Sequence, residues 1–244
     1  QPVREGAAGK LAHEWISAFA EPNAGEIWIG SAGQGIAVVG GNNPRTIRHN
    51  PLISSSVADD TIETMLVDHA GLLWLGTQQG ISVHYPQTGI RTLFGAEQRK
   101  DGLIGKDVRS VLASRDGRIW LGFAFQGVQI LDPANHASQI LAADPARPLQ
   151  ALPASQIMVA READNGDILL GTGHGVYRVH QSAAAQTSRT GRSAQTWQIG
   201  RIDLAPRDNV ERTTSLLIAH DRLWVGSNRD SLWQLAGTGL GQGD

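Results

Sequence analysis

Polar side chains recur at one position of the sequence, directly before a glycine that opens an apolar segment. The position holds Gln34, Gln79, Gln126 and His174, and Arg229 with Asp230 stands at a looser fifth place. A side-chain amide both donates and accepts hydrogen bonds and carries no charge. Several of them on one face would therefore suit a neutral polar ligand such as a sugar. The alternative interpretation is an ordinary solvated loop, in which polar residues beside a turn glycine are common.

A second group of polar residues precedes a recurring aliphatic position, which is held by Ile16, Ile62, Val108 and Ile157. Its members are His13, Glu14, Asp59, Asp60, Lys106, Asp107, Ser155 and Gln156. If each aliphatic residue belongs to an innermost strand, both groups open on the same face of the molecule. The predicted ligand-binding face comprises His13, Glu14, Gln34, Asp60, Gln79, Lys106, Asp107, Gln126, Gln156, His174 and Arg229.

A repeated tripeptide, Trp-aliphatic-Gly, indicates the elements that position these residues. Its copies are Trp28-Ile29-Gly30, Trp74-Leu75-Gly76, Trp120-Leu121-Gly122, Leu169-Leu170-Gly171 and Trp224-Val225-Gly226. Successive copies are separated by 46, 46, 49 and 55 residues. A period of about 40–50 residues in an all-β chain is typical of a β-propeller.

Each copy predicts one blade of four antiparallel strands. Asp116-Gly117 and Asn165-Gly166 signal a tight turn between the first and second strands. The second strand is a continuous apolar run, so both of its faces must be buried between neighbouring blades. Fourth strands are predicted at residues 46–49, 89–94, 138–142 and 196–202. The fifth copy lacks a fourth strand, and we expect residues near Val3 to supply it by pairing with residues 233–235.

The fold prediction is therefore an all-β propeller of four-stranded antiparallel blades with five repeats, which form either a five-bladed ring or an arc of a larger, seven-bladed propeller. The blades span residues 11–56, 57–102, 103–151, 152–203 and 204–235 of a single domain. Residues 236–244 are expected to form a flexible tail, and the Ser/Ala/Thr/Gln-rich residues 181–193 a mobile, solvated insertion.

Composition excludes several classes of function. The net charge of the 244-residue chain is -2 and no Lys/Arg cluster is present, so binding of nucleic acid or of an anionic membrane has no electrostatic basis. No apolar run approaches the length of a membrane span. The absence of cysteine excludes disulfides, thiolate metal sites and cysteine nucleophiles. The chain begins at Gln1 without Met, as either a processed mature form or a piece of a longer protein would. Because the repeats begin and end abruptly, we expect the piece cut from a longer protein.

Two copies of the repeat closely resemble the two-component regulator propeller repeat. They are residues 102–128, GLIGKDVRSVLASRDGRIWLGFAFQGV, and residues 68–81, DHAGLLWLGTQQGI. Copy four lacks the tryptophan and copy five lacks the turn glycine. The resemblance implies a periplasmic sensor region of a hybrid histidine kinase or a diguanylate cyclase. It also implies a small-molecule or oligosaccharide signal as partner, with a homodimer through the sensor as a further expectation. Members of that family usually carry two seven-bladed propellers, whereas five copies are visible here.

Two other classes of function stay open beside the sensor. One is a propeller enzyme, either a glycosidase or a lyase similar to the streptogramin-inactivating type, and the other is a scaffold for protein contacts. A glycosidase needs two facing carboxylates, and Glu63 is the only one well inside a predicted inner strand. His69, His136 and His220 show no metal-ligand spacing. Asp68 and Asp116 are interpreted as turn formers, and Trp15 and Trp233 as edge-packing or sugar-stacking residues. We therefore predict no catalytic residue, no metal and no cofactor.

Overall fold

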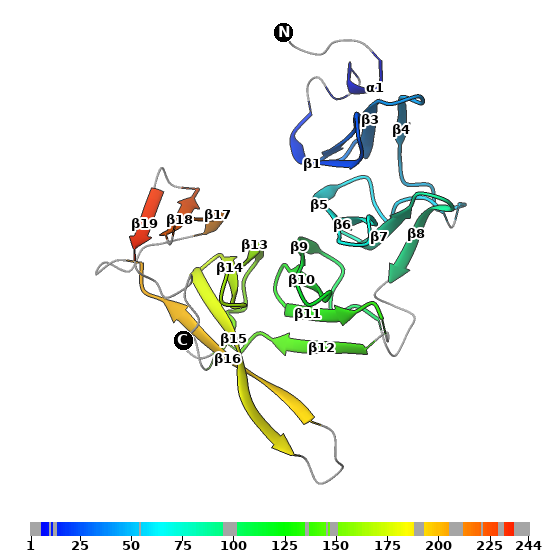
Figure 1. Ribbon diagram of the computed structural model, residues 1–244. Helices are drawn as coiled ribbons and strands as arrows, with labels where there is room; N and C mark the ends of the chain where they lie inside the picture. The colour runs from blue at the N-terminus through cyan, green and yellow to red at the C-terminus, as the bar shows by residue number, and fades with distance from the viewer. Residues whose placement is uncertain are drawn as a thin grey trace. The chain divides into compact units, whose positions relative to one another are not determined.

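The computed structural model contains almost only β-strands and short connections (Figure 1). It describes residues 6–9, 11, 14–53, 55–94, 102–134, 137–144, 146, 151–187, 193–204, 212–220, 222–228 and 232–236. The helix found in this part of the chain is the four-residue α1 (Gly6–Gly9). No helix among these residues is long and apolar enough to cross a membrane.

Within these residues the strands form five antiparallel sheets, called blades 1 to 5 in chain order. Blade 1 contains β1 (Ile16–Asn23), β2 (Glu26–Ser31), β3 (Ile36–Gly40) and β4 (Arg45–Ile47). Blade 2 contains β5 (Ile62–Val67), β6 (Leu73–Thr77), β7 (Gly80–Tyr85) and β8 (Gly89–Phe94). Blade 3 contains β9 (Val108–Ala113), β10 (Ile119–Phe123), β11 (Gly127–Asp132) and β12 (Ala137–Ala142).

Blade 4 contains β13 (Ile157–Glu162), β14 (Ile168–Thr172), β15 (Gly175–Thr187) and β16 (Ser193–Ile202). Blade 5 has three strands, β17 (Thr213–Ala219), β18 (Arg222–Ser227) and β19 (Leu232–Ala236). In every blade the strands pair in chain order. The predicted fourth strands coincide with β4, β8, β12 and β16 to within three residues at either end.

The chain divides into two compact units, residues 1–123 with 129–139, and residues 124–128 with 140–244. In the first unit β1 contacts β5 and β5 contacts β9, and in the second unit β13 contacts β17. First strands of consecutive blades therefore lie next to one another, as they do when sheets are arranged radially about an axis. The fold is a β-propeller, as the repeat predicts.

Two of the tripeptide tryptophans, Trp28 and Trp74, pack between their own blade and the next one. Trp28 is fully buried and packs with Ile62 and Leu75 of blade 2, and Trp74 packs with Val108 of blade 3. The indole N–H groups of Trp28, Trp74 and Trp120 donate to acceptors in or beside the first hairpin of their own blade. The pairs are Trp28 with Glu26 (2.6 Å), Trp74 with Asp68 (2.7 Å) and Trp120 with Ser114 (3.2 Å). The indole therefore contributes apolar area while its polar atom stays hydrogen-bonded.

The tripeptide glycines allow the close approach that the sequence predicts. A Cβ atom on Gly30 would lie 2.8 Å from Ile62, and one on Gly171 would lie 2.7 Å from Thr213. Both neighbours belong to the first strand of the following blade. Because a real Cβ is not found this close to another atom, a larger residue at either glycine would force the neighbouring inner strand to move.

The first hairpins have the expected turn geometry. Gly117 and Gly166 both have φ of 85°. Asp116 accepts hydrogen bonds from the backbone and side chain of Arg118 and from Ser114. Burial tends to raise the pKa of Asp116, but these hydrogen bonds outweigh it and hold that pKa below its usual value. In blade 5, where glycine is absent, His220 adopts a φ of 53° at the turn.

The predicted insertion, tail and closing strand are described by the structure only in part. In the insertion at residues 181–193, β15 continues to Thr187 and pairs with β16, which begins at Ser193 (Figure 1). The mobility expected for this insertion stays a prediction. Ala236, the first residue of the expected tail, belongs to β19. Val3, His136 and residues 237–244 lie outside the described residues, as do His13 and Arg229 of the predicted face.

Candidate functional site

The predicted binding residues before the turn glycine lie on loops of one repeated construction. In blades 1, 2 and 4 the tripeptide glycine is followed by a buried hydroxyl residue, which is Ser31, Thr77 or Thr172. Each hydroxyl donates to the carbonyl oxygen of the glycine that closes the loop, at 2.9 to 3.0 Å. It also accepts the backbone N–H of Gln34, Gln79 or His174, at 3.0 to 3.2 Å. The backbone of these loops is thus held, while the side chains of Gln79 and His174 are exposed.

Residues of the two predicted groups lie side by side within each unit. In the first unit the carbonyl oxygen of Asp60 accepts the N–H groups of Gly33 (3.2 Å) and Gly35 (2.8 Å), which flank Gln34. In the second unit the carbonyl oxygen of Gln156 accepts the N–H of Gly173 (3.1 Å), the neighbour of His174. The segment that leads into a first strand and the loop between second and third strands therefore open at the same end of a blade.

The carboxylate of Asp60 makes a hydrogen bond and an ion pair with other residues of the protein. It accepts the backbone N–H of His49 at 2.6 Å and forms an ion pair with Arg48 at 3.3 Å. This carboxylate joins the end of blade 1 to the beginning of blade 2. Asp60 therefore supports the predicted face through its backbone and its ion pair.

An ion-pair cluster on the inner strands lies at the same end of blades 2 and 3. Arg109 on β9 contacts Glu63 on β5 at 3.0 Å and Asp107 at 2.6 Å. Gln78 donates to Glu63 at 2.8 Å. Both donors contact Oε1 of Glu63, and Arg109 bridges Glu63 and Asp107. The cluster therefore differs from the pair of facing carboxylates that a glycosidase requires.

The other predicted residues are spread over the face. Glu14 is half-buried and its N–H donates to the carbonyl oxygen of Leu11 at 3.0 Å. The side chains of Lys106 and Gln126 are exposed, and the carbonyl oxygen of Gln126 accepts the N–H of Ala143 at 3.2 Å.

The two tryptophans outside the tripeptide register have different environments. Trp15 is 80% exposed. Trp233 is partly buried against the core that Leu216 and Leu223 share with blade 4. Edge packing, which was the first expectation for both indoles, therefore describes Trp233, whereas Trp15 presents an open aromatic surface.

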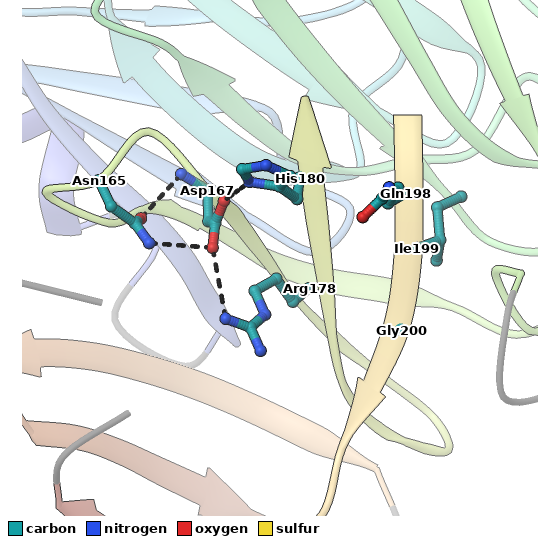
Figure 2. Close-up of a pocket in the computed structure, with 7 residues that line it drawn as sticks. All are labelled: Asn165, Asp167, Arg178, His180, Gln198, Ile199 and Gly200. Atoms are coloured by element: carbon teal, nitrogen blue, oxygen red, sulfur yellow. Dashed lines mark hydrogen bonds and ion pairs between the residues drawn. The ribbon is translucent and has the colours of Figure 1, made fainter. Parts of the chain in front are cut away.

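A cavity of about 430 Å³ lies in blade 4, beside its first hairpin (Figure 2). The hairpin contributes Asn165 and Asp167, and β15 contributes Arg178 and His180. The neighbouring strand β16 contributes residues 198–200. Asp167 directly precedes β14 and His174 follows it, so the cavity and the predicted face lie at opposite ends of that strand.

Asp167 organises the polar side of this cavity. Its side chain is 3% exposed, and its carboxylate contacts His180 Nδ1 at 2.6 Å, Asn165 Nδ2 at 3.1 Å and Arg178 at 3.6 Å. Figure 2 shows the carboxylate between these three side chains. A carboxylate that is nearly buried is stable only when it is paired and hydrogen-bonded in this way. Asp167 therefore fixes the imidazole and the guanidinium, whose side chains are 52% and 45% exposed.

The residues that pair between the second and third strands differ between blade 4 and blades 1 and 2, and this difference places charged side chains beside the hairpin of blade 4. Trp28 pairs with Val38 and Trp74 pairs with Val83, whereas in blade 4 Leu169 pairs with Arg178. The fourth strand opposite Arg178 contributes Gly200, which has no side chain. A smaller residue replaces the indole and a cation replaces valine, so the site becomes roomier and more polar.

Asp167, Arg178 and His180 are not among the residues predicted from the sequence. One signal was available, because copy four is the copy in which leucine replaces the tripeptide tryptophan. Arg178 and His180 lie nine and eleven residues beyond Leu169, and only the strand pairing brings them to the hairpin. Among the described residues no group of three or more His, Asp or Glu side chains is arranged to hold a metal ion.

No protein-family model and no curated protein matches the chain. Among solved structures, the chain is similar to the extracellular domain of the hybrid two-component system BT4673 of B. thetaiotaomicron, with a TM-score of 0.66 and 14% identity over 90% of this chain and 27% of that chain. The extracellular domain of the hybrid two-component system BT3049 of the same organism matches with a TM-score of 0.61 and 15% identity, over 95% and 35% of the two chains.

An enzyme shares the fold as well. A catalytically inactive virginiamycin B lyase from Staphylococcus aureus with quinupristin matches with a TM-score of 0.61 and 11% identity, over 90% of this chain and 65% of the lyase. This chain has the β-propeller fold of these proteins. It spans only 27% and 35% of the two sensor chains.

Proposed function

We propose that this chain is the ligand-sensing propeller region of a bacterial signal-transduction receptor of the histidine kinase or diguanylate cyclase type. The observation that carries the proposal is the repeat, which resembles the two-component regulator propeller repeat and folds into blades of the kind found in the extracellular domains of BT4673 and BT3049. The proposal places the chain in the periplasm, as part of an inner-membrane protein, and assigns it no catalytic step.

The binding site in this proposal is the end of the blades that carries Gln34 and Gln79 in the first unit, and His174 marks the equivalent end of blade 4 in the second unit. Their loops are fixed by buried hydroxyl groups, so these side chains stand on a preorganised backbone, which lowers the cost of ordering them on binding. Amide and imidazole groups suit neutral hydroxylated ligands. We therefore propose a neutral sugar or oligosaccharide as the signal, with a homodimer as the form that transmits it.

The test is thermal unfolding of the whole chain in the presence of a panel of neutral oligosaccharides. A ligand that binds only the folded state raises the melting temperature. Gln79→Ala should remove this stabilisation. Gln87→Ala should keep it, because Gln87 is an exposed glutamine on the β7–β8 turn at the other end of the same blade.

Failure to stabilise the chain with any sugar of the panel would contradict sugar sensing. Equal stabilisation of Gln79→Ala and the parent protein would move the site away from this face. If the mass in light scattering rises with concentration while no ligand stabilises the chain, the chain acts as a scaffold for protein contacts.

A propeller lyase is the second candidate, because the virginiamycin B lyase shares the fold over 90% of this chain. Incubation with quinupristin, followed by chromatography, tests this candidate directly. Consumption of quinupristin by the parent chain would favour the enzyme over the sensor, and an unchanged chromatogram would remove the reason for considering it.

A further inference from the structure

The cavity in blade 4 has a built polar wall that the proposed sensing face does not include. It lies at the opposite end of β14 from His174. Every polar group of its wall comes from the second unit, and Asp167 connects them. The side chains of this wall are therefore positioned before any ligand arrives.

The hydrogen bonds of Asp167 determine which polar atoms of the wall a ligand can contact. A carboxylate only accepts hydrogen bonds, so His180 must donate from Nδ1 to Asp167. The neutral imidazole then carries a lone pair on Nε2, which can accept a hydrogen bond from a hydroxyl group. With Asp167 3% exposed, the carboxylate itself is closed to a ligand, and the groups left to meet one belong to its partners.

Arg178 supplies the positive charge of the wall. Within the described residues its ion-pair partner is Asp167, at 3.6 Å, and its side chain is 45% exposed. A guanidinium presents five N–H donors in a planar fork that matches the two oxygens of a carboxylate. Asp167 engages one edge of this fork, and the remaining donors can pair with a second carboxylate from solution.

Space for such a ligand comes from Gly200, which lines the cavity without a side chain. Gly200 pairs with Arg178 across β15 and β16. A Cβ atom built on Gly200 would have no atom within 4 Å. The cavity volume of about 430 Å³ lies within the range of small-molecule sites.

We propose that this cavity binds a small hydroxylated carboxylate, such as a sugar acid. Arg178 pairs with the ligand's carboxylate, His180 Nε2 accepts a hydrogen bond from a ligand hydroxyl, and the Gln198 amide contacts the remaining polar atoms. Asp167 is a positioning residue that orients Arg178 and His180. The inference holds whether the chain is a sensor or an enzyme, since it depends only on blade 4.

The test is a titration of the whole isotope-labelled chain with glucuronate, glucose and acetate, followed by NMR. Glucuronate should shift the backbone amide signals of residues 178–180 and 198–200. Glucose lacks the carboxylate and acetate lacks the hydroxyls, so each should bind more weakly. Arg178→Gln should weaken glucuronate binding about tenfold or more, the loss expected for a charge-assisted hydrogen bond.

Two further variants separate the cavity from its surroundings. Gly200→Leu should abolish binding by filling the cavity, and the open space around Gly200 allows the fold to be kept. Asp164→Asn removes an exposed carboxylate of the same hairpin and should leave glucuronate binding unchanged. Circular dichroism shows whether each variant is folded.

Three results would overturn the proposal. One is the absence of any shift in the unmodified chain at millimolar glucuronate, which needs no variant to interpret. Another is binding of glucose or acetate as tight as that of glucuronate, which would mean that the site does not select a hydroxylated carboxylate. The third is a shift map confined to residues near Gln79 and His174, which would assign the ligand to the sensing face.

Discussion

His84 is a partly buried imidazole between blades 1 and 2. Its ring centroid lies 4.7 Å from that of Trp28, and its Nδ1 is buried without a hydrogen-bond partner in the part of the protein that the structure describes. Burial lowers the pKa of His84 below its ordinary value of 6.5. Nearby Arg45 lowers this pKa further, against a smaller opposing effect of Glu26. The folded protein therefore favours the neutral ring.

This shift predicts a loss of stability in mild acid. Because the pKa is lower in the folded state, the unfolded state binds the proton first as pH falls. The contribution of His84 is complete above the unfolded value of 6.5 and is lost as pH falls toward the folded value. His84→Phe should reduce the loss of unfolding free energy between about pH 7.5 and about pH 5.5, measured by urea denaturation. His69 is exposed, so His69→Phe is the control. An equal change of unfolding free energy with pH in the parent protein and in both variants would contradict the prediction.

At the scale of the element, the turns depend on backbone angle more than on space. Gly117, in the first hairpin of blade 3, and Gly200, in β16, would both place a Cβ in open space. They differ because Gly117 has φ of 85° and Gly200 is not in the left-handed region. The pair therefore isolates the energy of the left-handed conformation from the energy of packing.

Alanine at these two glycines should have opposite effects. Gly117→Ala should lower the free energy of unfolding by about 1–2 kcal/mol, the cost of left-handed backbone for a residue with a Cβ. Gly200→Ala should leave it unchanged or raise it slightly, because alanine restricts the unfolded chain. Chemical denaturation measures both, and a comparable loss in the two variants would refute the role of φ.

The strands could be predicted well because each is specified locally. The apolar runs around Trp74 and Trp120 and the Asp116-Gly117 turn contain the information for their own strands. The cavity could not be predicted in the same way. Arg178 and His180 meet Asp167 through the pairing of β14 with β15, and residues 181–187 extend β15 although their composition is typical of a loop. Pairing energy from the neighbouring strand overrides local preference there.

Adjacent blades within a unit share a hydrophobic core, as blades 1 and 2 do. Trp28 belongs to blade 1 but is buried among Ile62, Leu73 and Leu75 of blade 2. In repeat proteins stability is approximately a sum of terms within each repeat and between adjacent repeats. Damage to one inter-blade core should therefore reach the adjacent blade.

Hydrogen exchange of two tryptophan variants tests this coupling. Trp28→Ala should cost about 3–5 kcal/mol and increase exchange in β5 and β6 as well as in β1–β3. Trp15→Ala removes an indole that is 80% exposed and should change stability by less than about 0.5 kcal/mol. Faster exchange in blade 1 alone after Trp28→Ala would show that the blades fold as separate units.

The period of the tryptophan tripeptide was sufficient to predict the propeller, because each interval between copies corresponds to the length of one blade. The binding face could be predicted only as an end of each blade. Gln34 and His174 do lie at that end. The pairing of Asp60 with Arg48, and the sharing of Arg109 by Glu63 and Asp107, could not be predicted. These ion pairs join residues from different strands and loops, which local patterns do not encode.

The glycines that touch the next inner strand also bear on how such a protein can change over time. At Gly30 and Gly171 the separation of adjacent sheets is set by main chain against side chain, with no room for adjustment. The loops that carry Gln79 and His174 are held by hydroxyl-to-backbone bonds that do not involve those side chains. Amino-acid replacements on the loops can therefore accumulate without disturbing the framework, and descendants of one scaffold are free to acquire new chemical preferences there.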